Sequence, residues 1–189
     1  MLSKNKHSGF TIVELLIVIV VIGILAAITI VAYNGIQARA NDTKIRSVAM
    51  QIEKALKLWH VDAGVEPKSG WGSTAAFNGT SCTDGAGGWL YKGAYTCTLE
   101  DVLLSGQYIA PGVILSAPKN KDYNTSSNGR FTFMFYPCTS SAGLYALYWY
   151  LESPSAEDTA SIARAESAGC PTAPRMTYAM KAARLVRFN

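Results

Sequence analysis

The sequence predicts an α+β fold in which one long N-terminal helix packs on a small antiparallel β-sheet head. Three observations lead to this fold class. An uncharged apolar run extends from Leu15 to Ala32, a stripe of apolar residues at helical spacing continues to Trp59, and two aromatic-rich strand candidates lie in the last third of the chain. A sheet laid against the stripe would bury both apolar faces. The length of 189 residues suits one domain with an appendage.

The apolar run from Leu15 to Ala32 is long enough to cross a membrane as a helix. Its only polar side chain is Thr29, and about 20 helical residues match the ~30 Å hydrocarbon core of a bilayer. Lys4 and Lys6 precede the run, so the positive-inside rule predicts a cytoplasmic leader and an exported remainder. The run continues into more helix instead of a cleavage loop, unlike an ordinary secretory signal. A single-pass anchor that is never cut is the simpler alternative.

One carboxylate, Glu14, stands at the head of the apolar run. A carboxylate at membrane depth is costly unless it is paired, so its presence points to a function. The alternative is that Glu14 only reaches back to the lipid headgroups.

A short basic leader ends in Gly9, Phe10 follows it, and Glu14 is the fifth residue counted from Phe10. This order of N-terminal residues resembles the start of type IV pilins and secretion pseudopilins. The resemblance implies a prepilin with leader 1–9, cut by prepilin peptidase between Gly9 and Phe10, and methylated on the new N-terminus at Phe10. It implies that Glu14 acts in assembly. Val31 stands in a stretch where many relatives carry a proline, so we expect no kink there.

The helix is predicted to run from Phe10 to Ala63, with a membrane-spanning and assembly half at 10–33. Beyond that half, apolar residues recur at spacings of three and four and form one stripe. Gly64 and Pro67 end the pattern. The stripe consists of Ile45, Val48, Ala49, Ile52, Ala55, Leu56 and Trp59.

The remaining residues, 64–189, are predicted to form the extracytoplasmic head. The glycine-rich stretch 64–93 is expected to be a loop whose aromatic residues pin it to the core. A sugar- or surface-binding loop that uses Trp71 and Trp89 is the alternative. A short helix follows, with Thr98 as its cap and Gly106 at its end.

Two strands, Arg130–Tyr136 and Leu144–Leu151, are apolar enough to be buried on both faces. Between the second strand and the tail, Ser155–Ala168 is predicted to be a helix capped by Ser155 and ended by Gly169. The tail, Met176–Phe188, is read as a third strand or as a helix. An antiparallel sheet of these strands would cover the helix stripe.

All four cysteines lie after the apolar run, which fits export to an oxidising compartment. Four cysteines allow three pairings. The sequence separations favour Cys82 with Cys97 and Cys138 with Cys170. A zinc site is the alternative, but no C-x-x-C spacing supports it.

No other constellation points to catalysis or to a cofactor. Asn120, Asp122 and Asn124 alternate oxygen side chains as in a calcium loop, but no glycine and glutamate complete the pattern, so a polar turn is favoured. His7 and His60 are isolated in the sequence, and no Ser-His-Asp grouping is recognisable. We therefore predict no enzyme, no metal and no cofactor.

Four cations in the tail, Arg175, Lys181, Arg184 and Arg187, are followed by no acidic residue. Lysine and arginine on an edge strand discourage aggregation, which is the favoured interpretation. Weak binding of DNA or an anionic surface, multiplied along a fibre, is the alternative. The formal net charge of +4 is too small to argue a nucleic-acid partner by itself.

The resemblance to type IV pilins implies a structural subunit that polymerises through its helix into an extracellular filament for adhesion, motility or DNA uptake. Its implied partners are further copies of the chain, prepilin peptidase, the membrane as a single-pass precursor, and the pilus assembly machinery. A pseudopilin of a type II secretion or competence system is the alternative within the superfamily. A membrane-anchored binding protein that never polymerises is the alternative from another class.

Overall fold

The computed structural model describes residues 10–64, 75–77, 80–82, 99–120, 132–139 and 143–188. The chain divides into two compact units, Met1–Ala38 and Arg39–Asn189. Helix α1, Ile12–Ala63, contributes to both units and has 52 residues. It continues without interruption past Val31, as expected for a chain with no proline there.

Both ends of α1 have a local cause. The helix begins two residues later than the expected Phe10, because Thr11 caps it: its Oγ1 accepts a hydrogen bond from the Glu14 backbone N–H at 3.2 Å. At the other end Gly64 adopts φ +65° and donates its N–H to the His60 carbonyl at 2.9 Å. A glycine in the left-handed region is a common helix terminator, so the predicted stop at this glycine is confirmed.

The sheet of the head is antiparallel in the order β3-β4-β5, formed by Phe133–Pro137, Leu144–Trp149 and Ala182–Arg187. The two predicted strands are thus present, although β4 ends at Trp149 and not at Leu151. Strand β3 ends one residue later than predicted, and residues 130 and 131, at its expected start, lie outside the described residues. The tail supplies the third strand, and β5 lies at an edge of the sheet.

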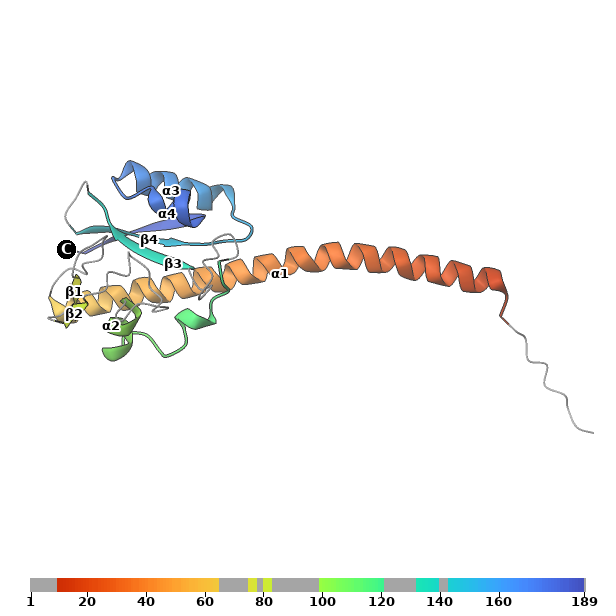
Figure 1. Ribbon diagram of the computed structural model, residues 1–189, viewed down its shortest axis with the longest axis horizontal. Helices are drawn as coiled ribbons and strands as arrows, with labels where there is room; N and C mark the ends of the chain where they lie inside the picture. Colours follow the sequence, from red (N-terminus) through yellow and green to blue (C-terminus); the bar gives the residue numbers. More distant parts are fainter. Residues whose placement is uncertain are drawn as a thin grey trace, which may run out of the picture. The chain divides into compact units, whose positions relative to one another are not determined.

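The two faces of the sheet are covered by different helices (Figure 1), α1 on one side and α3 with α4 on the other. On the α1 side, the Phe188 ring lies 4.9 Å from the His60 ring and 5.3 Å from the Tyr145 ring. On the opposite face, the Tyr148 hydroxyl donates to the Pro171 carbonyl at 2.9 Å. Burial on both faces explains why these strands are almost continuously apolar.

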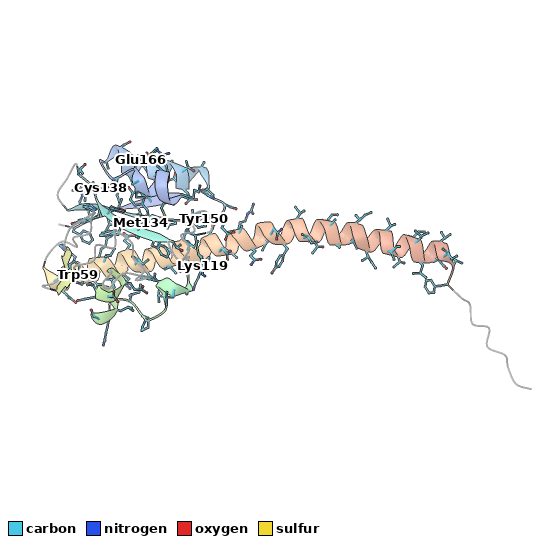
Figure 2. The ribbon with its side chains drawn as sticks, in the orientation of Figure 1. Trp59, Lys119, Met134, Cys138, Tyr150 and Glu166 are labelled. Carbon is cyan, nitrogen blue, oxygen red and sulfur yellow. A yellow bond between two sulfur atoms is a disulfide. The ribbon has the colours of Figure 1, made fainter. Side chains whose placement is uncertain are left out.

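The predicted helix stripe is confirmed as the side of α1 that packs in the head. Figure 2 labels Trp59 near the end of α1 and Met134 on β3, and both are buried. All seven stripe residues are at most 3% exposed: Ile45, Val48, Ala49, Ile52, Ala55, Leu56 and Trp59.

Three short helices complete the described head: α2, Leu99–Ser105; α3, Ala156–Ser167; and α4, Ala173–Tyr178. A single 3₁₀ turn, Ile114–Ser116, lies between α2 and β3. The predicted cap of α3 is confirmed, since Ser155 accepts from the Asp158 N–H and the Asp158 carboxylate accepts from the Ser155 N–H. Thr98, the expected cap of α2, lies outside the described residues.

The expectation of a loop throughout 64–93 is wrong in one place. Ala75–Phe77 and Thr80–Cys82 pair as a small antiparallel hairpin, β1 and β2. The sequence between these strands is Asn78-Gly79, a strong hairpin signal that the glycine-rich composition of the stretch concealed.

Candidate functional site

The first turn of α1 contains the only carboxylate of the apolar half of the helix. Glu14 Oε2 accepts hydrogen bonds from the Thr11 backbone N–H at 2.8 Å and from the Thr11 hydroxyl at 2.7 Å. Together with the return bond from the Glu14 N–H, these contacts form a capping box. The sequence contains the T-x-x-E pattern of a capping box at Thr11 to Glu14, a signal for Thr11 that the sequence analysis did not use.

The capping box positions Glu14 at the N-terminal end of the helix, where the helix dipole favours a negative charge. Phe10, the predicted N-terminus after processing, is 80% exposed beside it. Gly9, the predicted residue before the cut, lies outside the described residues. Among the described residues, only Thr11 hydrogen-bonds to the Glu14 carboxylate.

Beyond this turn, α1 presents a continuous apolar surface. From Ile12 to Val31 its large apolar side chains remain between 48% exposed, at Val21, and 81% exposed, at Ile12. Exposed apolar area of this extent marks a surface that another molecule or a membrane covers. Among the described residues, α1 is the one helix long and apolar enough to cross a bilayer, and the 18-residue window that qualifies is 0% buried.

The second unit is held to its part of α1 by polar contacts as well as by the stripe. Asp42 is 1% exposed, and its two carboxylate oxygens accept from the backbone N–H groups of Glu152 and Ser153 at 2.7 and 2.9 Å. Asn41 donates to the Glu152 side chain at 2.9 Å. These contacts fix the segment after β4 to the helix. The sequence did not predict them, because an aspartate on a helix usually faces solvent.

A further polar contact joins α1 to α3. Arg46 pairs with Asp158 at 2.7 Å. Burial acts to raise the pKa of the Asp158 carboxyl, but the hydrogen bonds from Arg46 and Ser155 outweigh it and hold the pKa below its ordinary value. The carboxylate that caps α3 therefore also binds α1.

Cys138 and Cys170 form a disulfide across a sequence separation of 32 residues, the pairing that the sequence favoured. It links the residue after β3, labelled in Figure 2, to the segment after α3. The Thr139 N–H also donates to the Gly169 carbonyl at 2.9 Å beside it. Cys82 is the last residue of β2, and Cys97 lies outside the described residues, so the Cys82–Cys97 pairing stays a prediction.

Comparisons with known proteins show which family the chain belongs to. Residues 4–30 match the family described as the prokaryotic N-terminal methylation motif. The type IV major fimbrial protein FimA of Dichelobacter nodosus is 34% identical over 110 residues, which are 52% of this chain and 70% of FimA. The chain belongs to the type IV pilin superfamily. This confirms the resemblance, and with it the expectations of a membrane-anchored precursor and of a structural protein instead of an enzyme.

Other relatives of this pilin match mainly over part of their length. The type IV major pilin protein PilE of Neisseria gonorrhoeae is 35% identical over 65 residues, 34% of this chain and 39% of PilE. The type II secretion system core protein G of Aeromonas hydrophila is 32% identical over 77 residues, 41% of this chain and 54% of that protein. The pilin thus spans about half, or less, of the length of these two relatives. No solved structure matches it.

The cations in the pilin's tail do not form one patch. Arg175 pairs with Glu166 at 2.8 Å, and Arg184 pairs with Glu53 of α1 at 2.8 Å. Arg184 and Arg187 are three residues apart on β5 and therefore lie on opposite faces of the sheet. The position of β5 at the sheet edge suits the edge-protection interpretation, and DNA binding by the tail stays a prediction.

The remaining candidate sites lie largely outside the described part of the pilin. Trp71, Trp89, Asp122 and Asn124 are all outside it, and Asn120 is 2% exposed. Within the described residues no three His, Cys, Asp or Glu side chains gather as a metal site would require.

Proposed function

We propose that this pilin is a structural subunit of a type IV pilus. In this proposal prepilin peptidase cuts the chain between Gly9 and Phe10, Phe10 is N-methylated, and α1 residues 10–33 polymerise with those of other copies into a helical filament. The match of residues 4–30 to the N-terminal methylation motif supports the processing step.

The observation that carries the proposal is the exposed apolar surface of α1 with Glu14 at its head. Each large apolar side chain from Leu15 to Val31 is at least 48% exposed. Such a surface is stable in a bilayer before assembly, where α1 satisfies its own backbone hydrogen bonds. When the subunit leaves the bilayer, copies of the same helix are the apolar partners that every subunit has available.

Glu14 supplies the specificity that apolar packing lacks. Cutting after Gly9 gives Phe10 a free amine, four residues before Glu14 and just outside the N-terminus of α1. In a growing filament the amine of an incoming subunit meets Glu14 of a subunit already docked. The attraction is strong at low dielectric, and an unpaired carboxylate there is costly. The charge pair would recruit the subunit and set its axial register, with Thr11 holding the carboxylate at the helix start.

Two substitutions separate the charge of Glu14 from its capping role. Glu14→Gln retains a side chain that can complete a capping box, whereas Glu14→Ala removes both functions. We expect both variants to insert and to be cut, so that mass spectrometry finds a chain beginning at Phe10, but to yield almost no sheared fibres. Fibres made only of the Gln variant at normal yield and length would contradict the charge-pairing mechanism. A wild-type chain still beginning at Met1, in a host with active prepilin peptidase, would contradict the processing step.

A pseudopilin is the second candidate, favoured by the similarity to the type II secretion system core protein G. The same α1 surface and the same cut serve both functions. Deleting the gene separates them: loss of long surface fibres supports the pilus, and loss of protein secretion without loss of long fibres supports the pseudopilus. Recovery of the processed chain in membranes alone, with none in sheared fibres, would instead indicate an anchored protein that does not polymerise.

A further inference from the structure

Two adjoining cavities open between the second half of α1 and strand β5. The smaller has a volume of about 140 Å³ and is lined by Arg46, Ala49, Met50, Trp149 and Arg184. The larger, about 450 Å³, shares Met50 and Arg184 with it. We call the two together the α1–β5 cleft. It lies wholly within the second compact unit.

The α1–β5 cleft is more cationic than the net charge of the chain would predict. Arg46 and Arg184 line its smaller cavity, and Lys54 and Lys57 line the larger. The opposing carboxylates among the described residues are Glu53, which pairs with both Lys57 and Arg184, and Asp158, which pairs with Arg46. Positive charge is therefore in excess, and an anionic ligand is favoured.

Trp149 adds a hydrogen-bond donor that the fold does not use. Strand register puts it opposite Phe133 and Ala182, on the face that packs against α1, and it is 9% exposed. Its indole Nε1 is buried and has no hydrogen-bond partner among the described residues. A buried donor without an acceptor is rare in native structures, and this residue forms part of the wall of the smaller cavity.

Arg46 and Arg184 also have guanidinium N–H groups that their ion pairs do not use. Arg46 engages Asp158 through Nη2, and Arg184 engages Glu53 through Nε. A guanidinium carries five N–H groups, and its planar fork matches phosphate oxygens. The smaller cavity is thus lined by three donor side chains, and a phosphate monoester presents three terminal oxygens.

We infer that the α1–β5 cleft binds a phosphate monoester carried on a small apolar group. The phosphate occupies the smaller cavity, with Arg46, Arg184 and the Trp149 indole as donors. The apolar group lies in the larger cavity against Met50 and its neighbours Leu58 and Val61, which are 47% and 77% exposed. This inference uses only the second unit and does not rest on the proposed filament.

The indole signals of the full pilin in a non-ionic detergent test the inference. Phenyl phosphate is titrated into ¹⁵N-labelled protein, and the indole ¹H–¹⁵N peak that is missing in Trp149→Phe identifies Trp149. We expect this peak to shift downfield with saturation, as the N–H gains an acceptor. Arg184→Gln should raise the apparent Kd for phenyl phosphate about tenfold or more, since a charge-assisted hydrogen bond is lost. Arg184→Lys should retain part of the affinity.

Arg187→Gln is the matched control, because it removes the same charge from the same strand on the opposite face of the sheet. It should leave the titration unchanged. A Trp149 peak that does not move, or that moves equally in Arg184→Gln, would overturn the inference. An equal response to neutral benzyl alcohol would show that no anion is recognised, and tighter binding of benzoate than of phenyl phosphate would contradict the assignment to phosphate.

Discussion

The two halves of α1 have similar apolar side chains and opposite environments. Leu25 in the first half is 58% exposed, and Leu56 in the second half is 0% exposed. The same contrast holds for Ile22 at 58% and Ile52 at 0%. Composition makes a helix apolar, but only a partner surface buries it. The second half has its partner, the sheet, within its own compact unit, whereas the first half depends on molecules outside the chain.

The second half also differs in its polar residues. Asp42, Arg46 and Glu53 each bind a group far away in the sequence, in the segment after β4, in α3 and in β5. Among the described residues, the side chains of the first half make only the local hydrogen bonds of Thr11 with Glu14 and of Thr29 with the Leu25 carbonyl. Long-range polar contacts give the second half one register on the sheet.

The largest expected change in the free energy of unfolding comes from one of two matched leucine substitutions. Leu56→Ala should lower the free energy of unfolding of the head by about 3 to 5 kcal/mol, because it leaves a cavity in the core. Leu25→Ala should change it by less than about 0.5 kcal/mol. Urea denaturation in detergent, followed by tryptophan fluorescence, measures both. Similar losses from the two variants would contradict the contrast between the two halves of α1.

A smaller effect is expected from the disulfide, which belongs to the second unit alone. Replacing both Cys138 and Cys170 with alanine should lower the head's free energy of unfolding by about 2 to 4 kcal/mol, the usual cost of opening a loop of this size. The helicity of residues 10–33 in detergent, read by hydrogen exchange, should not change. Faster exchange there would show that the two halves are coupled in stability.

The smallest effect concerns pH and the contact of Arg46 with Asp158. Because the folded protein lowers the pKa of Asp158, its contribution to stability is present above the unfolded pKa of about 3.9 and is lost as pH falls through the folded value. Asp158→Asn should therefore reduce stability at neutral pH by at most about 1 kcal/mol and flatten the loss of stability on acidification. Arg46→Gln should flatten it in the same way. A slope that neither variant alters would contradict this role.

The sequence predicted those parts of the fold that follow from periodicity and local signals. The stripe from Ile45 to Trp59, the cap at Ser155 and the stop at Gly64 each depend on residues a few positions apart. The contacts of Asp42 with Glu152 and of Glu53 with Arg184 could not be assigned this way, since these partners lie more than 100 residues apart and a helical carboxylate usually faces solvent. The α1–β5 cleft was missed for the same reason: Arg46 and Arg184 meet only through the tertiary fold.

The candidate site at the helix start was predictable because it is local. The order of Gly9, Phe10 and Glu14 before the apolar run is enough to predict their roles in processing and assembly. The family match over residues 4–30 includes all three. The tail cations were harder to interpret, because a strand sends Arg184 and Arg187 to opposite faces. The order of charged residues along the chain does not show which of these cations lie on the same face of the sheet.

The most direct test of the central claim asks what covers the first half of α1 in the assembled protein. A photoreactive amino acid in place of Leu25 is irradiated in purified sheared fibres, and the products are separated under denaturing conditions. We expect a ladder of covalently joined chains, which disappears when the fibres are first dispersed in detergent. Fibres that yield only single chains, or only lipid adducts, would contradict the claim that copies of this helix cover one another.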